Sequence, residues 1–247
     1  LTGAGIVMDA GGYIGSIQLH DLRDGAGIVL SNAAAPKGVT ITTGDISQGS
    51  EINLGGSFLK SLTAARARDV SLTAPYAGKI ALKGDKKRSM NPDLGGELTF
   101  TRADAKTVSL GSLAAGAVAD ASIDAAGGLK SIKILQWLSG EIVADWIGSL
   151  AVTGNFGADV TLDGKTAGAA KAALNSAKIT GNLVADLWDI KGNLGKLAVS
   201  GVARGASAAD PLTVRSTGSM AGLTLGAVEH ADFLAGVAPA AGRHATA

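Results

Sequence analysis

The stretch that decides the fold is GEIVADWIGSLAVTGNFGADVTLDG, residues 140–164, which returns in part as GNLVADLWDIKGNLGKLAVSG, residues 181–201. Matching positions such as Val143 and Val184 lie 41 residues apart. Both copies contain VAD and, further on, the triplet LAV, and a third VAD ending at Asp120 precedes the similar segment KSIKI. Residues one or more coils apart in a solenoid share one environment, so a returning strand pattern favours stacked coils.

Apolar-x-apolar triplets recur along the whole chain, and this alternation is typical of strands with one buried face. Several of them are ten residues apart, as Ile132 and Ile142 or Leu150 and Val160 are, with glycine-rich turn signals between them. An antiparallel sandwich or barrel also fits this spacing, but it does not explain the returning stretch. We therefore expect an all-β chain that forms a right-handed parallel β-helix, a β-solenoid of about seven to ten coils with short loop or helix insertions.

Two stretches interrupt this rhythm. The charged segment KGDKKRSMNPDLGG, residues 83–96, contains Asn-Pro and predicts a protruding loop. The alanine-rich segment GKTAGAAKAALNSAK, residues 164–178, predicts a short helix laid on the coil. Because neither divides the chain, we expect a single solenoid domain over residues 1–237, followed by a linker or frayed tail over 238–247.

The composition excludes several classes of protein. The 247 residues include 22 Lys and Arg against 21 Asp and Glu, which is not the basic excess of a nucleic-acid-binding protein. No cysteine is present, so disulfides and cysteine metal sites are excluded, and 46% hydrophobic residues argue against disorder. No run approaches the ~18 apolar residues of a membrane span. The start, LTGAGIVMDAGG, lacks the pattern of a signal peptide, so we expect a mature chain or an excised piece.

The segments GSLAVTGNFGADVTLDG, LGKLAVSG and MAGLTLGAVEHADFLAGV resemble the strand-repeat regions of large secreted or surface-exposed bacterial proteins. Those regions form right-handed parallel β-helices, and the resemblance covers residues 123–237. It implies an extracellular or cell-surface location and the role of a stalk, an adhesin-like segment or a scaffold. It carries no catalytic residues to this chain.

The candidate ligand-binding residues are three aspartates and two arginines. Asp120, Asp145 and Asp186 each end a VAD, and stacked along one side of a solenoid they would form an acidic row for calcium or a polysaccharide. Alternatively, each ends a strand and bonds the backbone of its own turn. Arg66 and Arg68, in RARD, are candidates for binding an acidic sugar or are simply solvated charges. We expect no cofactor, and the glycine-rich nonapeptide repeat that would support calcium binding is absent.

Two further groups of residues have alternative interpretations. His20 stands beside Asp21 and Arg23, which fits either a small acid–base or metal cluster or a polar turn. Without a HExxH pattern or paired histidines, a zinc site is not predicted. The tryptophans, all in the repeated half, form either a sugar-stacking platform or part of the closed core: Trp137, Trp146 and Trp188.

These patterns together predict a non-catalytic structural or adhesive segment of an extracellular bacterial protein, a rigid rod that displays loops. Two alternatives stay open: a carbohydrate-active or carbohydrate-binding β-helix, and a self-assembling fibre or surface-layer component. The expected partners are polysaccharides or other surface proteins. End-to-end self-association is also expected, because the ends of such a rod expose unpaired strand edges.

Overall fold

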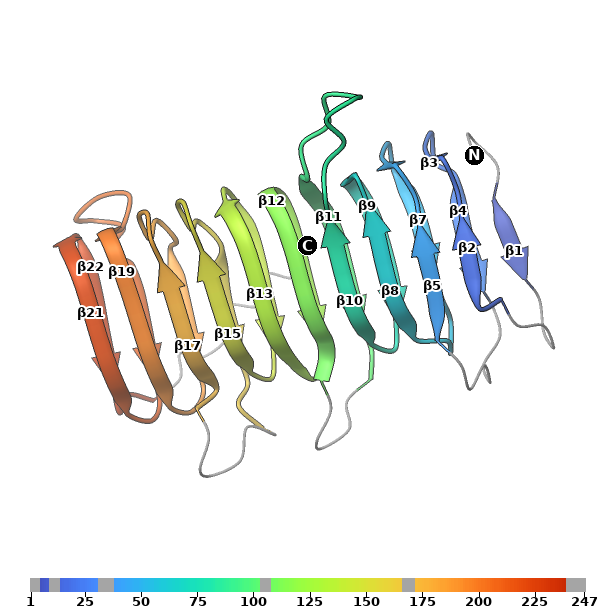
Figure 1. Ribbon diagram of the computed structural model, residues 1–247. Coiled ribbons are helices and arrows are strands. Elements are labelled where there is room, and N and C mark those ends of the chain that lie inside the picture. The colour runs from blue at the N-terminus through green and yellow to red at the C-terminus, as the bar shows by residue number, and fades with distance from the viewer. Residues whose placement is uncertain (1–4, 9–13, 31–37, 103–107, 166–171, 239–247) are drawn as a thin grey trace.

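The computed structural model describes residues 5–8, 14–30, 38–102, 108–165 and 172–238. The described chain winds into about 9 coils of parallel strands stacked along one axis, which confirms the predicted parallel β-solenoid (Figure 1). No helix occurs in the described residues. Coils follow one another from the N-terminal end to the C-terminal end, so neighbours along the rod are also neighbours in sequence.

Each coil has three faces, which the chain visits in the order B, C, A. Face B contains β2 Ser16–Gln18, β5 Val39–Thr42, β8 Leu59–Ala64, β10 Ala77–Leu82, the first part of β12 Val108–Ala125, β13 Gly128–Trp137, β15 Ile147–Val152, β17 Leu174–Ile179, β19 Leu194–Arg204 and β21 Met220–Glu229. Face A contains β1 Ile6–Met8, β4 Gly27–Leu30, β7 Ser50–Asn53, most of β9 Arg66–Ala74, β11 Leu94–Phe100, the end of β12, β14 Gly140–Ala144, β16 Asp159–Leu162, β18 Leu187–Ile190, β20 Leu212–Ser216 and β22 Ala231–Ala235.

Face C is much shorter than the other two. It consists of β3 Asp21–Leu22 and β6 Asp45–Ile46, then of one to three residues in each following coil, among them the ends of β19 and β21. In the C-terminal half this column is continued by single bridges that join Trp137 to Phe156, Phe156 to Leu183, and Leu183 to Ala203. One inward side chain per coil is thus enough to close the third side of the triangle.

The strand register explains the spacing seen in the sequence. Ile132 pairs with Leu150 on face B, and Ile142 pairs with Val160 on face A. The ten-residue spacing is therefore the step from one long face to the next within a coil, and a full coil of this part takes 18 residues, from 132 to 150. The two LAV triplets lie in the same column of face B, two coils apart.

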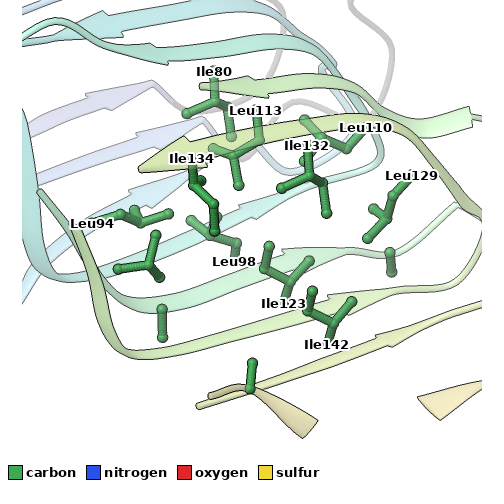
Figure 2. Close-up of a cluster of buried hydrophobic side chains, with 14 of the residues drawn as sticks. Ile80, Leu94, Leu98, Leu110, Leu113, Ile123, Leu129, Ile132, Ile134 and Ile142 are labelled. Carbon is green, nitrogen blue, oxygen red and sulfur yellow. The ribbon is translucent and has the colours of Figure 1, made fainter. Parts of the chain in front are cut away.

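One hydrophobic cluster fills the solenoid along its axis. In Figure 2, Ile80, Leu113 and Ile132 follow one another on face B, opposite Ile123 and Ile142 of face A. These inward side chains are fully buried, as strict alternation requires of a sheet with one face on the core. Stacked branched side chains and continuous backbone ladders hold successive coils together.

The core becomes aromatic in the C-terminal half. Trp137 and Trp188 are fully buried on either side of Phe156, with edge-to-face contacts at centroid distances of 5.6 and 5.5 Å. Trp146 lies instead at the corner from face A to face B, where its ring fills the space that a Cβ on Gly128 would need. The interpretation of the tryptophans as a sugar-stacking platform is therefore wrong for Trp137 and Trp188, which are core residues.

The two segments that interrupt the strand rhythm of the sequence differ in the structure. The end of the alanine-rich segment, Leu174 to Lys178, belongs to strand β17, so the expected helix is wrong there, and residues 166–171 lie outside the described residues. The charged segment leaves the coil after β10 and returns at β11 as a loop that stands out from the rod (Figure 1). Most of the expected tail, residues 239–247, also lies outside the described part.

Candidate functional site

A groove of about 600 Å³ follows the corner between face C and face A through successive coils. Its lining is mostly acidic and small: Gly49, Asp69, Val70, Ser71, Gly96, Glu97, Asp120, Ala121, Ser122, Gly140, Glu141 and Asp159. Each of these coils turns the corner tightly, without an inserted loop. The groove is therefore a consequence of regular stacking, and its lining repeats with the coil.

Left-handed backbone at the corner sets the shape of the groove. Asp69 and Asp120 have φ values of 53° and 49°, and Gly96 and Gly140 have 99° and 118°. Aspartate tolerates this region better than most residues, and glycine adopts it freely. A Cβ on Gly140 would lie 2.0 Å from the carbonyl oxygen of Ala121 in the preceding coil. Small residues are thus required where the turns pack most closely.

The first outward position of face A forms a row of acids and hydroxyls. Along the rod the row reads Glu51, Ser71, Glu97, Ser122, Glu141 and Asp159. Neighbouring strands of a sheet are about 4.8 Å apart, so acids that alternate with serines recur about every 10 Å. Ser122 Oγ donates a hydrogen bond to Glu141 Oε1 at 3.2 Å, which links neighbouring coils. The row can accept hydrogen bonds from hydroxyl groups or pair with cations.

The three VAD aspartates do not form a single row. Asp120 and Asp186 both lie at the corner from face C to face A and are exposed, whereas Asp145 follows β14 at the opposite end of face A. Asp145 is 4% exposed, so it is a core-edge residue and not a surface ligand. The predicted row of three is wrong because the second VAD ends face A, while the other two end face C.

The two exposed VAD aspartates interact with neighbouring coils. Ser139 Oγ donates to Asp120 Oδ1 at 2.8 Å, and the Asp120 amide donates back to Ser139 Oγ at 3.0 Å. The amide of Asp186 donates to Asp159 Oδ1 at 3.0 Å. Burial and the nearby carboxylates of Asp159 and Asp210 raise the pKa of Asp186. The Asp120 carboxylate thus bonds a serine of the next coil, and the Asp186 contact uses its backbone amide, so the turn interpretation and the ligand-binding interpretation both stay predictions.

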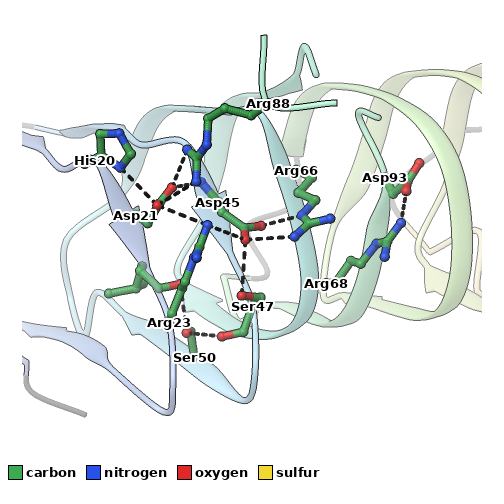
Figure 3. A network of polar contacts seen from close by, with 11 residues as sticks. His20, Asp21, Arg23, Asp45, Ser47, Ser50, Arg66, Arg68, Arg88 and Asp93 are labelled. Atoms are coloured by element: carbon green, nitrogen blue, oxygen red, sulfur yellow. Dashed lines mark hydrogen bonds and ion pairs between the residues drawn. The ribbon is translucent and has the colours of Figure 1, made fainter. Parts of the chain in front are cut away.

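The two candidate arginines have carboxylate partners. Arg66 donates from Nε and Nη2 to the carboxylate of Asp45, at 2.6 and 3.0 Å, and these hydrogen bonds raise its pKa (Figure 3). Arg68 pairs with Asp93 and is half exposed. Arg68 and Asp120 line a second hollow of about 500 Å³ that adjoins the groove and shares Asp69 with it. The structure thus brings Arg68 and Asp120 to one place, and leaves Arg66 in a separate network.

The network of Arg66 and Asp45 also includes His20 and connects to the charged loop. His20 Nδ1 lies 3.0 Å from Asp21 Oδ2, and Arg88 of the loop donates from both terminal nitrogens to Asp21 at 2.8 Å (Figure 3). Arg23 bridges Asp21 and Asp45 at 3.1 Å to each. Burial alone would raise the pKa of Asp21, but Arg88, the Asp45 amide, His20 and Arg23 together hold it well below its ordinary value.

Sequence reasoning missed the residues that line the groove most regularly. Glu97 and Glu141 carry no shared motif, and their only signal is that each precedes an inward Leu98 or Ile142 in an alternating strand. Among the described residues, no group of three or more His, Cys, Asp or Glu is arranged to hold a metal ion. A helix capable of crossing a membrane is not found in the described part of the chain.

Comparisons of the chain with protein-family models, with curated proteins and with solved structures gave no match.

Proposed function

We propose that the protein is a non-catalytic structural or adhesive segment of an extracellular bacterial protein, a rigid rod that presents the loop 83–93 to an anionic partner. The observation that carries the proposal is the ion pair between Arg88 and Asp21, two residues 67 positions apart. It fixes an exposed loop in one orientation relative to the rod. The partner class that follows is an acidic polysaccharide or an acidic surface protein.

The loop is also ordered by its own hydrogen bonds. Asp85 and Met90 exchange backbone hydrogen bonds of 2.8 and 2.9 Å, and Asp85 Oδ1 accepts from the amide of Lys87 at 2.9 Å. At its base, the amide of Gly116 donates to the carbonyl of Pro92 at 2.6 Å. A loop that is ordered before binding loses less conformational entropy when a partner engages it.

The charges left free on the loop favour an anionic partner. Arg88 is occupied by Asp21, whereas the side chains of Lys83, Lys86 and Lys87 are exposed. Three ammonium groups on one ordered loop attract sulfate, uronate or phosphate groups, with an affinity that salt weakens. The groove carries the opposite charge and follows the corner between face C and face A, and the hollow that adjoins it reaches Asp93 at the base of the loop.

The test is binding of the 247-residue chain to a panel of immobilised acidic polysaccharides, with and without calcium. We expect Lys86→Glu with Lys87→Glu to lower the affinity at least tenfold. The matched control, Lys130→Glu with Lys133→Glu on face B, makes the same change of charge on exposed residues and leaves binding unchanged. No binding across the panel, or equal loss in both double variants, would contradict the proposal.

The groove supports a second candidate, a carbohydrate-binding or carbohydrate-active β-helix. Its supporting observation is the acid–hydroxyl row, which runs along the rod as an extended polymer would. In the same panel extended with neutral polysaccharides, Glu97→Gln with Glu141→Gln would abolish binding or the release of new chain ends, while the lysine variants would keep both. The two candidates therefore make opposite predictions for the same pair of double variants.

A further inference from the structure

The two long faces of the rod carry opposite charges on their outer surfaces. Where the described strands lie on face B, they contain no acidic residue, and their exposed lysines are Lys60, Lys79, Lys130, Lys133, Lys178 and Lys196. Where the described strands lie on face A, the outward arginine Arg215 pairs with Asp189. The other outward carboxylates of face A are Glu51, Glu97, Asp124, Glu141, Asp159 and Asp232. The net charge of +1 conceals this division.

The opposite charges of the two faces do not neutralise each other within one copy. In the described part of the chain, none of the six lysines pairs with a carboxylate. The carboxylates of Glu51 and Glu141 accept hydrogen bonds from neutral groups, the side-chain amide of Asn53 and the hydroxyl of Ser122. Like charges that share one face repel each other, and a partner of opposite charge relieves that repulsion. Each long face therefore suits a partner that carries the charge of the other face.

The charges of the two faces also match along the rod. Strands β10 and β11 belong to one coil, and β13 and β14 belong to the coil two further on. The first of these coils carries Lys79 on face B and Glu97 on face A, and the second carries Lys133 and Glu141. Because strands of neighbouring coils are about 4.8 Å apart, both faces repeat their charge after about 10 Å. Two parallel rods placed side by side in register therefore bring lysines opposite carboxylates.

Face B is large enough for a stable contact between proteins. It extends over about 9 coils with strands of six residues such as β10 and β15, which gives about 800 Å² per copy. Interfaces of standard size bury about 800 Å² on each partner. The residues that pair with Lys79 and Lys133 in neighbouring coils are Ser112, Ala114 and Ala151, whose small side chains leave room for the lysines.

We propose that face B of one copy packs on face A of a second copy, so that parallel rods associate side by side. Faces A and B lie on opposite sides of the core, so each added copy presents a further face of each kind (Figure 2). Such a heterologous contact does not close when copies are related by translation, and the stack of rods grows with concentration. The contact depends on exposed ion pairs, so salt weakens it. The inference does not rest on the proposed function, because the loop 83–93 is anchored to face C and takes no part in the contact.

Charge reversal on either face tests the contact. At about 20 mM salt, sedimentation velocity of the 247-residue chain should show species larger than the monomer, and about 0.5 M salt should dissociate them. Lys79→Glu with Lys133→Glu impairs face B, and Glu97→Lys with Glu141→Lys impairs face A, so each double variant alone should associate at least tenfold more weakly. In an equimolar mixture, the intact face A of the first variant meets the intact face B of the second, so dimers should return.

The matched control for charge is Lys86→Glu with Lys87→Glu, which makes the same change on the loop and should leave association unchanged. Circular dichroism melting shows whether the variants keep the fold. A chain that stays monomeric at low salt up to about 100 µM, a mixture that stays monomeric, or an equal loss in the loop variant would overturn the proposal. A monomer whose Lys79 and Lys133 are needed to bind phosphatidylserine vesicles would instead identify face B as a surface for anionic membranes, which also overturns it.

Cross-linking identifies which faces meet, and the natural chain has no cysteine to interfere. Ser131→Cys places a thiol on the outside of face B, and Val143→Cys places one on the outside of face A in the same coil. A short bis-maleimide should join the two variants in a mixture, leave each variant single when alone, and give a ladder of larger species with the double variant. Efficient joining of Ser131→Cys chains to one another would show that face B meets face B, and would refute the proposed contact.

Discussion

The outward column of face C is charged in the N-terminal coils and neutral in the C-terminal coils. Asp21, Asp45 and Arg66 lie in successive coils and are joined by ion pairs and hydrogen bonds. Further along, Asn155 Oδ1 accepts from the amide of Asn182 at 3.0 Å, and Asn182 Oδ1 accepts from the amide of Val202 at 2.9 Å. The same position in the coil is thus stabilised by ionised groups at one end and by amides at the other.

The charged column and the amide ladder depend on different conditions for their stability. The amide ladder links each coil only to the next and depends on neither pH nor salt. The charged column needs ionised carboxylates, and it recruits Arg88 from a loop that lies far away in sequence. Beneath the two columns the core differs as well, because the C-terminal half packs Trp137, Phe156 and Trp188, while the N-terminal coils place small and branched residues there.

The largest expected effect is in the aromatic core. Phe156→Ala removes a fully buried ring between two tryptophans and should cost about 3–5 kcal/mol of unfolding free energy. Hydrogen exchange should accelerate in β15 to β19 and remain slow in β5 to β9, because each coil of a solenoid contacts only its neighbours. Phe58→Ala, at a half-buried corner ring, is the matched control and should cost less. Equal acceleration along the whole rod would contradict the local character of the core.

The next largest effect is expected in the charged column. Asp45→Ala leaves Arg66 and Arg23 without their shared carboxylate and should cost about 2–3 kcal/mol. The cost lies below that of a fully buried pair because both guanidinium groups reach solvent. Urea unfolding of the variant against Asp124→Ala, an exposed aspartate of face A, measures the difference. A loss no larger than that of the control would show that the arginines find other partners.

Low pH should weaken the charged column and leave the amide ladder intact, without any substitution. Burial would raise the pKa of Asp45, but the hydrogen bonds and charge of Arg66 outweigh burial and hold the pKa below its ordinary value of 3.8. The pair therefore contributes fully above about pH 4, and its contribution is lost as the pH falls through the folded pKa. Amide exchange corrected for its intrinsic pH dependence should show weaker protection at the Arg66 amide, whose side chain pairs with Asp45, as the pH falls below about 4, and unchanged protection at the Val202 amide. Parallel loss at both amides would mean that ionisation does not distinguish them.

The amide ladder should respond more weakly to substitution. Asn182→Ala leaves the amide of Val202 without its acceptor and should cost about 1–2 kcal/mol. Because no charge is involved, the cost should be the same in 0.1 and 1 M salt, whereas that of Asp45→Ala should shrink in high salt. Asn175→Ala, an exposed asparagine on face B, serves as the control. A salt-dependent cost for Asn182→Ala would contradict the distinction between the columns.

The smallest effect is expected at the exposed end of the charged column. Arg68 pairs with Asp93 but is half exposed, so Arg68→Ala should cost at most about 1 kcal/mol. Arg66 lies two residues earlier on the same strand, β9. Thermal unfolding of Arg68→Ala and Arg66→Ala compares the stability that each arginine contributes. We expect the loss at Arg66 to be the larger, and a reversed order would show that exposure does not rank these two pairs.

The solenoid itself could be predicted, because inward Ile, Leu and Val must alternate on every long strand and the returning LAV triplets mark one column. Face C could not, since a face of one inward residue per coil, such as Phe156 or Leu183, leaves no alternation to read. The likeness of the VAD segments was misleading at Asp145, because a strand can end at two different corners of a coil. The link between Arg88 and Asp21 depends on how a loop folds back, which a single sequence does not encode in any local pattern.

The anchored loop also has a mechanical consequence. Hydrogen bonds between coils run along the rod axis, so tension applied to the two ends opens them one ladder at a time, as in a zipper. Asp21 lies on β3 and Arg88 follows β10, so their ion pair forms a second connection parallel to the ladders of the intervening coils. Under load, part of the force bypasses those ladders through the side chains. The first coils should therefore yield as one block, and the coils beyond β12, where the ion pairs Lys191–Asp163 and Arg215–Asp189 join only adjacent coils, one by one.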